Sequence, residues 1–137
     1  MRKAAMVLQV LLGLVYLGAA IPKLAGAQEA MRQQLELAPW FWSVTALAEL
    51  VGVASLVVGI KYPRVAVAGG LWVSAIMAGA LVSHARVGDP AQNLVAPAVL
   101  LVLALAVAAV RGRELGAFRG SRARPGHAAG GEESRLG

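Results

Sequence analysis

The chain has 137 residues, 58% of them hydrophobic, and it carries a formal net charge of +6. That length suits one domain, and hydrophobic residues gathered in blocks indicate a helical integral membrane protein rather than a soluble globule. Cysteine is absent, which excludes a disulfide framework, a thiol nucleophile and redox chemistry at a CxxC pair. The basic residues lie in loops and a tail without a nucleic-acid-binding motif, so we expect no nucleic-acid partner.

Four apolar runs fill most of the first 110 residues, and each approaches the ~20 residues that a helix needs to cross a bilayer. We therefore predict an all-α fold in which residues 1–111 form a four-transmembrane-helix bundle. The expected spans are about 4–21, 40–60, 65–84 and 93–111. Residues 112–137 are rich in Gly, Arg, Ser, Ala and Glu without an aliphatic pattern, which predicts a disordered basic C-terminal tail on the cytoplasmic side.

The distribution of lysine and arginine predicts the orientation of these spans. Ten basic residues lie at the N-terminus, in the second connection or in the tail, against three, Lys23, Arg32 and Arg86, in the other connections. The positive-inside rule then places both termini in the cytoplasm of a multi-pass protein of the cell membrane. The first span also resembles a secretory signal peptide, but its length and the three later spans favour an uncleaved helix.

Polar side chains are expected to point from the first two spans into the bundle. Gln9, Tyr16 and Lys23 are seven residues apart and share one face of the first helix. Thr45 and Glu49 are four residues apart on the second span and likewise share a face. Both stripes should therefore be buried between helices.

The longest connection, residues 24–39, separates the first span from the second. Its pattern predicts a short amphipathic helix over 28–37 that lies at the outer membrane surface. Trp40, Phe41 and Trp42 follow and are expected to anchor the second span at the interface.

Glu49 is the strongest functional signal in the sequence. A charged side chain inside a membrane helix costs at least ~2.5–3.5 kcal/mol on insertion scales, so it needs a partner or a function. The expected topology brings Glu49 to the same membrane face as Lys23 and His84. We take Glu49 and His84 as candidate catalytic residues. The candidate ligand-binding residues are Tyr16, Lys23, Glu49, His84, Arg86 and Asp89.

Two interpretations of Glu49 stay open. It can form a structural ion pair with Lys23 or Arg86 that ties helices together, or it can handle protons or bind a ligand beside His84. No metal site is expected, because the other histidine, His127, lies in the tail on the opposite side and leaves zinc and haem without ligands. Tyr16 and the tryptophans either pack in the bundle and at the interface or line a slot for a flat hydrophobic ring.

The segments GAAIPKLAG at 18–26, LAELVG at 47–52 and SHARVGDP at 83–90 resemble the DoxX-like family of small bacterial proteins with four membrane helices. The resemblance covers about residues 5–110 and places the family's lysine, membrane glutamate and third-helix histidine at Lys23, Glu49 and His84. The family takes its name from a small subunit associated with a thiosulfate:quinone oxidoreductase, and other relatives are linked to redox-stress membrane complexes. The resemblance thus implies association with the quinone pool, without an intrinsic cofactor but with a bound quinone as a candidate ligand.

The expected function is that of a quinone- or lipid-associated accessory subunit of a membrane oxidoreductase system. Its expected partners are the lipid bilayer and either an oxidoreductase or a second copy of the chain. One alternative is a non-catalytic assembly or chaperone factor, and another is an acid–base enzyme that acts on a hydrophobic substrate through Glu49 and His84. A small multidrug transporter fits less well, because those proteins carry the glutamate in the first helix, where this chain has Lys23.

Overall fold

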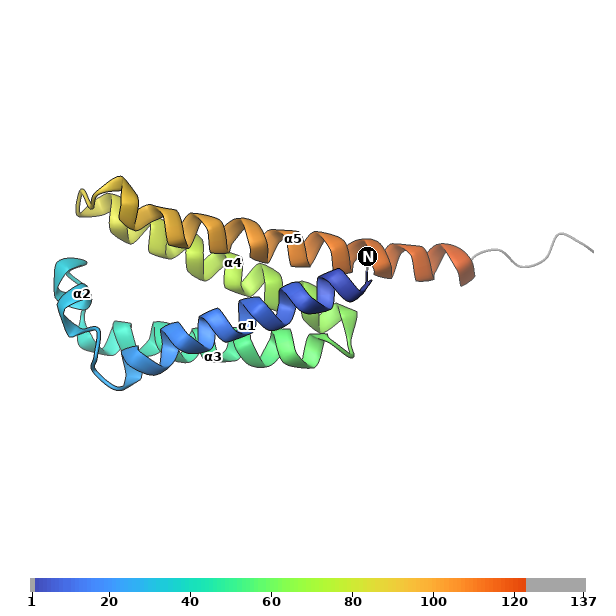
Figure 1. Cartoon of the computed structure of the whole chain (residues 1–137), viewed down its shortest axis with the longest axis horizontal. Coiled ribbons are helices and arrows are strands. Elements are labelled where there is room, and N and C mark those ends of the chain that lie inside the picture. Colours follow the sequence, from blue (N-terminus) through green and yellow to red (C-terminus); the bar gives the residue numbers. More distant parts are fainter. Residues whose placement is uncertain (1, 123–137) are drawn as a thin grey trace, which may run out of the picture.

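Helices form all the regular elements of residues 2–122, the part of the chain that the computed structural model describes (Figure 1). They are α1 (Arg2–Leu24), α2 (Glu29–Gln34), α3 (Pro39–Gly59), α4 (Pro63–Arg86) and α5 (Ala91–Arg122). Four of them, α1, α3, α4 and α5, are long and apolar enough to cross a membrane. This confirms the predicted all-α fold with four membrane helices.

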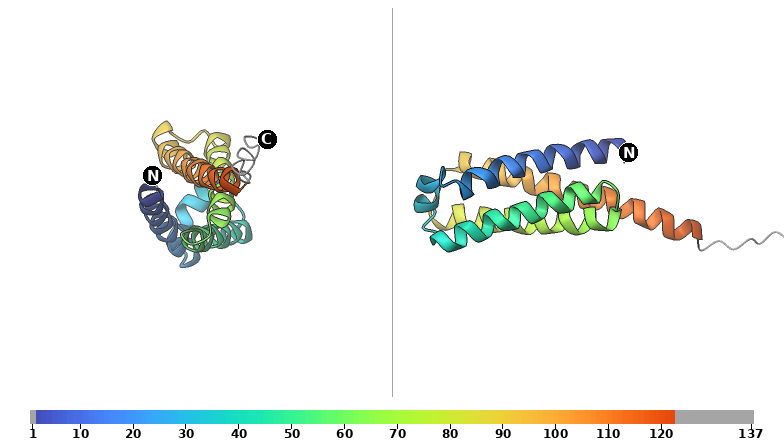
Figure 2. Two further views of the ribbon diagram at one scale, coloured as in Figure 1. Left: turned by 90° about the vertical axis from the view of Figure 1, so that its right-hand side faces the viewer. Right: turned by 90° about the horizontal axis from the view of Figure 1, so that it is seen from below.

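The four long helices form a ring in the order α1, α3, α4, α5, with α5 returning to α1 (Figure 2). The short helix α2 and the α4–α5 turn lie at one end of the bundle, which we call the α2 end (Figure 1). At the opposite end, which we call the terminal end, α1 begins, α3 turns into α4, and α5 extends beyond the other helices. The beginning of α1 and the end of α5 therefore lie on the same side of the bundle.

Small residues allow α3, α4 and α5 to approach closely. A Cβ atom added at Gly59 would lie 2.6 Å from the Cα atom of Ala66, and one at Gly70 would lie 2.9 Å from the Ala104 carbonyl oxygen. Both distances are shorter than normal van der Waals contact, so a larger side chain would push the helices apart. Gly79 differs, because no atom lies within 4 Å of the position its Cβ would take.

The polar face of α1 points into the bundle, as the sequence predicts. Gln9 and Tyr16 are each 1% exposed, and the Gln9 side-chain amide donates to the Leu56 carbonyl oxygen of α3 at 3.0 Å. The buried members of the surrounding core are Leu12, Tyr16, Leu56, Val73, Met77, Ala104 and Val107. Because Lys23 shares this face of α1, its side chain is also directed toward α3.

Helix boundaries near the α2 end differ from those expected. α1 continues through Pro22 to Leu24 instead of ending at residue 21. The proline removes only its own N–H from the helix, and the N–H of Ala25 still donates to the Ile21 carbonyl at 3.0 Å. The amphipathic helix expected over 28–37 is shorter, because it ends at Gln34. Two residues later, Glu36 adopts a left-handed φ of 52°, which a continuing helix would not allow.

The last helix continues past its expected end at residue 111 and reaches Arg122, so that part of the predicted tail is helical. Arg111 and Glu114 form an ion pair of 2.7 Å across one turn, which supports the continuation. The rest of the predicted tail, residues 123–137, lies outside the described residues.

Candidate functional site

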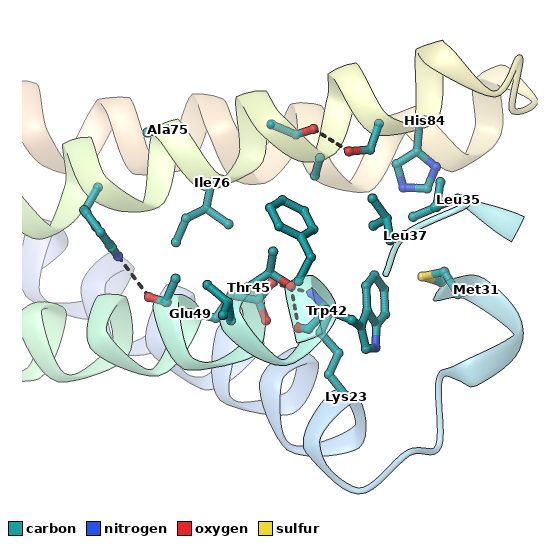
Figure 3. Close-up of a pocket in the computed structure, with 17 residues that line it drawn as sticks. Lys23, Met31, Leu35, Leu37, Trp42, Thr45, Glu49, Ala75, Ile76 and His84 are labelled. Carbon is teal, nitrogen blue, oxygen red and sulfur yellow. Dashed lines mark hydrogen bonds and ion pairs between the residues drawn. The ribbon is translucent and has the colours of Figure 1, made fainter. Parts of the chain in front are cut away.

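A cavity of about 410 Å³ lies between α1, α3 and α4 toward the α2 end, and α2 and the residues after it form one of its walls (Figure 3). Its volume falls within the range of small-molecule sites, about 300–1,000 Å³. The larger apolar and aromatic side chains in its lining are Met31, Leu35, Leu37, Phe41, Trp42, Val44, Trp72 and Ile76. Its polar lining residues are Lys23, Thr45, Glu49, Ser83 and His84.

Glu49 and Lys23 meet at the wall of the cavity formed by α1 and α3 (Figure 3). The Lys23 Nζ atom donates to Glu49 Oε1 at 2.5 Å, and Glu49 as a whole is only 1% exposed. The Lys23 ammonium also lies 4.9 Å from the centre of the Trp42 ring. A cation at that distance from an indole face is attracted by the ring, so Trp42 helps to hold the ammonium beside the carboxylate.

The second oxygen of the Glu49 carboxylate, Oε2, has no partner in the described part of the chain. Oε2 is buried, and no donor among the described residues lies within hydrogen-bonding distance of it. The Tyr16 hydroxyl is likewise buried without a partner in the described part of the chain. A buried acceptor without a donor is unfavourable, and such atoms are uncommon in folded proteins, so Glu49 Oε2 is a point at which a ligand could bind.

His84 lies nearer the α2 end and is held by a carboxylate of its own. Its Nδ1 atom lies 2.5 Å from Asp89 Oδ2, and the Gln34 side-chain amide of α2 donates to Asp89 Oδ1. The bond with His84, together with that from Gln34, holds the pKa of the Asp89 carboxyl below its ordinary value. An ionised Asp89 accepts a hydrogen bond from the Nδ1–H group, which leaves the other ring nitrogen of His84 free for a ligand.

Arg86 fastens the α2 region to α4 and does not line the cavity. Its guanidinium donates to the Leu35 carbonyl oxygen at 2.7 Å. On α2, Arg32 pairs with Glu29 and donates to the Leu37 carbonyl oxygen at 2.5 Å. The hydrogen bond from Arg32 lowers the pKa of Glu29 to about 2. These contacts place Leu35 and Leu37 against the cavity.

The structure brings three of the sequence-predicted site residues together and separates the other three from the cavity. Lys23, Glu49 and His84 all line it, although Glu49 and His84 bond to different partners rather than to each other. The Tyr16 side chain is buried in the apolar core instead. Arg86 and Asp89 lie outside the cavity lining. Arg86 bonds to Leu35 in the α2 region, and Asp89 bonds to His84.

The sequence left open whether the tryptophans pack or line a slot, and the structure places Trp42 and Trp72 in the lining of the cavity. Trp40 is 69% exposed, as an interfacial anchor would be, but Trp42 is only 7% exposed and contacts Lys23. Trp72 donates from Nε1 to the Ala48 carbonyl oxygen at 2.9 Å and so links α4 to α3 beside the cavity. The spacing of Trp42, seven residues before Glu49, was the available signal, because it places both on one face of α3.

A second buried ionic cluster, at the terminal end, was also missed. Arg111 is fully buried, and its Nη2 atom donates to the carbonyl oxygens of Gly59 at 2.9 Å and Ile60 at 3.0 Å. Its Nη1 atom pairs with Glu114 at 2.7 Å. The last carbonyls of a helix have no partner within it and carry its negative dipole end, so Arg111 stabilises the end of α3.

The chain also matches a known protein family. Residues 7–107 match the model of the DoxX-like family. This range holds most of α1, all of α2, α3 and α4, and with them Lys23, Glu49 and His84. No curated protein and no solved structure matches the chain.

Proposed function

The chain belongs to the DoxX-like family of proteins and is an integral membrane protein, and from these premises we propose that it is an accessory subunit of a membrane oxidoreductase system that binds a lipid-soluble ring compound such as a quinone. The observation that carries the proposal is the apolar cavity with the Lys23–Glu49 pair in its wall. Phe41 and Trp42 offer flat surfaces for a ring. Lys23 has N–H donors to spare for an oxygen of that ring.

The charges around the cavity favour a neutral ligand. Glu49 is neutralised by Lys23. Asp89 is bonded to His84, and the positive charge of Arg86 lies two residues after His84 on α4. A cation transporter needs a carboxylate that is available to the cation, and here an internal ammonium already occupies one oxygen of it. The pairing therefore argues against the transporter alternative and agrees with an uncharged, lipid-soluble molecule.

The accessory role follows from what the chain lacks. It has no cysteine, so it offers no thiol couple of its own. Electrons exchanged with a bound quinone would come from a partner oxidoreductase, and we expect such a protein to copurify with the full chain from native membranes.

Ligand binding can be tested by filling the cavity. Gly79 lines it and has open space at its Cβ position, so Gly79→Leu should fill the cavity without a backbone clash. Gly18→Leu is the matched control, because Gly18 also has open space but lies on the exposed face of α1. Each variant is purified in mild detergent, its bound lipids are identified by mass spectrometry, and quenching of its tryptophan fluorescence by a short-chain benzoquinone is titrated.

We expect Gly18→Leu to retain the wild-type ligand and quenching, and Gly79→Leu to lose both. Equal ligand content and equal quenching in the two variants would show that the cavity is not the binding site.

A second candidate function, acid–base catalysis on a hydrophobic substrate, is favoured by the His84–Asp89 contact. A carboxylate on Nδ1 fixes the orientation of an imidazole and leaves its other nitrogen for proton transfer. If this function holds, His84→Gln should accumulate a bound substrate that the wild type converts. The mass spectra of lipids extracted from the two proteins would then differ by one chemical step.

We further infer that both termini face the cytoplasm and that the α2 end faces outward. The ten-to-three bias of basic residues supports this orientation. Reporters fused after Arg32 and after Asp89 should therefore be located outside the cytoplasm, and a reporter fused after Arg122 should be located inside it. The reverse pattern would place Lys23, Glu49 and His84 on the cytoplasmic side.

A further inference from the structure

We propose that the cavity binds the hydroxyl-bearing, reduced form of its ring ligand, a phenol or quinol, more tightly than the carbonyl-bearing oxidised form, and that Glu49 Oε2 accepts the hydrogen bond from that hydroxyl. The proposal rests on the proposed function, because it names which chemical form of the ligand the same cavity holds. Its basis is the one buried carboxylate oxygen of the cavity wall that no described residue satisfies.

The two oxygens of Glu49 stand in different situations. Oε1 receives the Lys23 ammonium at 2.5 Å, whereas no donor of the described chain reaches Oε2. In the ion pair the carboxylate is ionised, and an ionised carboxylate only accepts hydrogen bonds. The group that completes this site must therefore bring a donor.

A hydroxyl and a carbonyl behave oppositely at this point. A quinone carbonyl is itself only an acceptor, so it can accept from Lys23 but offers no donor to Oε2, and that oxygen stays unsatisfied. A phenolic hydroxyl can donate to Oε2 and, through its own oxygen, accept from one of the free N–H groups of Lys23. One hydroxyl thus satisfies both members of the ion pair.

Lys23 is held where this geometry requires it. Its ammonium lies 4.9 Å from the centre of the Trp42 ring as well as 2.5 Å from Glu49, so two groups on α3 fix its position. Trp42 beside this pair and Phe41 elsewhere in the cavity lining supply an apolar surface for the ring that carries the hydroxyl. The site therefore combines an apolar surface for the ring of the ligand with a carboxylate oxygen that lacks a hydrogen-bond donor.

The other polar side of the cavity has the same preference. Asp89 accepts a hydrogen bond from the Nδ1–H group of His84, so in the neutral ring the remaining nitrogen is an acceptor. His84 points from α4 toward the cavity near Leu35 and Leu37 (Figure 3). A second hydroxyl, or a hydroxyl on a different part of the ligand, would find an acceptor there as well.

The test compares three ligands that share one ring and one short alkyl chain: a hydroquinone, its benzoquinone and its dimethyl ether. Binding to the full-length protein in detergent is measured anaerobically by isothermal calorimetry and by quenching of tryptophan fluorescence. The dimethyl ether keeps the shape of the reduced ring but has no donor. We expect the hydroquinone to bind at least about tenfold more tightly than the other two, as a hydrogen bond to a charged group implies.

Variants assign the preference to Glu49. Removing both charges with Glu49→Gln and Lys23→Met should bring the ratio of hydroquinone to benzoquinone affinity close to one. The control is Glu36→Gln, which removes an exposed carboxylate that does not line the cavity and forms no ion pair with a described residue, and it should leave the ratio unchanged. The ratio in the wild-type protein tests the inference even if the double variant does not fold.

The outcomes separate this inference from the function on which it rests. If the three ligands bind equally, or the benzoquinone binds best, the preference is overturned while ring binding stands. If none of them binds, the proposed quinone-binding function fails and this inference fails with it.

Discussion

Buried ionic clusters lie at both ends of this bundle, but they differ in what surrounds them. At the α2 end, the Lys23–Glu49 pair borders a cavity of about 410 Å³. At the terminal end, Arg111 is fully buried and its guanidinium is divided between Glu114 and the last carbonyls of α3. Both clusters contain buried polar atoms without partners among the described residues. Only the first of them places such an atom on a residue that lines this cavity.

The comparison shows that a buried charge in a membrane helix does not identify a functional site without further evidence. Arg111 satisfies carbonyl groups that α3 cannot satisfy itself, which is a structural task. Glu49 lines the cavity and has one buried oxygen that its structural partner leaves free. We therefore expect variants at the terminal end to change stability, and variants at the α2 end to change ligand binding.

The largest expected effect on stability comes from Arg111. Arg111→Met leaves Glu114 and the Gly59 carbonyl without their donor inside the bundle, which should lower the free energy of unfolding by about 3–5 kcal/mol. The control is Arg113→Met, since Arg113 is exposed. Unfolding by denaturant in detergent, followed by circular dichroism, measures the difference. Equal stability of the two variants would mean that the Arg111 contacts do not support the fold.

The next largest effect on stability is expected at Glu49, where a double variant distinguishes a structural role of the ion pair from a role in ligand binding. Glu49→Gln leaves the Lys23 ammonium without its partner, and because that side chain is 13% exposed and can shift toward the surface, we expect a loss of about 2–3 kcal/mol. Combining it with Lys23→Met removes both charges and should restore stability to within about 1 kcal/mol of the wild type. The double variant should nevertheless bind its hydroxyl-bearing ligand more weakly than the wild type. Ligand retention at the wild-type level would assign a structural role alone to the pair.

How far the sequence could predict this arrangement depends on the kind of contact. The four spans, the inward face of Gln9, Tyr16 and Lys23, and the common location of Lys23, Glu49 and His84 follow from helical periodicity and from the direction of each span. Those properties are set locally, or by topology. They do not require knowledge of which side chains meet.

The remaining features depend on three-dimensional contacts that no spacing encodes. In the sequence Arg111 is one more basic residue at the end of a span. Its burial becomes evident only when α5 is placed against the end of α3. Gln34 of α2 bonds to Asp89 only because α2 meets the α4–α5 turn, although the two residues are 55 positions apart in the sequence. The cavity itself arises from packing between α1, α3 and α4, for which the apolar pattern gives no measure.

A smaller effect is expected where α3 meets α4 near the terminal end. Gly59→Ala would place a methyl group 2.6 Å from the Ala66 backbone and shift the carbonyl that Arg111 binds. Overpacking of this kind typically costs about 1–3 kcal/mol. Gly18→Ala, where a Cβ meets no atom within 4 Å, is the control and should not be destabilising. If thermal unfolding shows the same stability for both, the close approach of α3 and α4 is less tight than the structure indicates.

The smallest effect concerns the α2 end and depends on pH. The bond from His84 keeps the pKa of folded Asp89 below that of an aspartate in the unfolded chain, which is about 3.9. A group with a lowered folded pKa contributes stability that is fully present above the unfolded value and is lost as the pH falls through the folded one. The wild type should therefore be more stable than Asp89→Asn at pH 6, and the difference should shrink below about pH 4.

Unfolding curves of the two proteins at a series of pH values between 6 and 3 measure this difference. Glu29 also has a lowered pKa and loses stability in the same direction, but it is present in both proteins and cancels in the comparison. Asp89→Asn should also loosen the hold of α2 on the cavity, because Gln34 bonds to the same carboxylate. A difference that stays constant down to pH 3 would show that Asp89 acts through shape alone, and the His84–Asp89 contact would then resemble the packed cluster at the terminal end more than a proton-handling site.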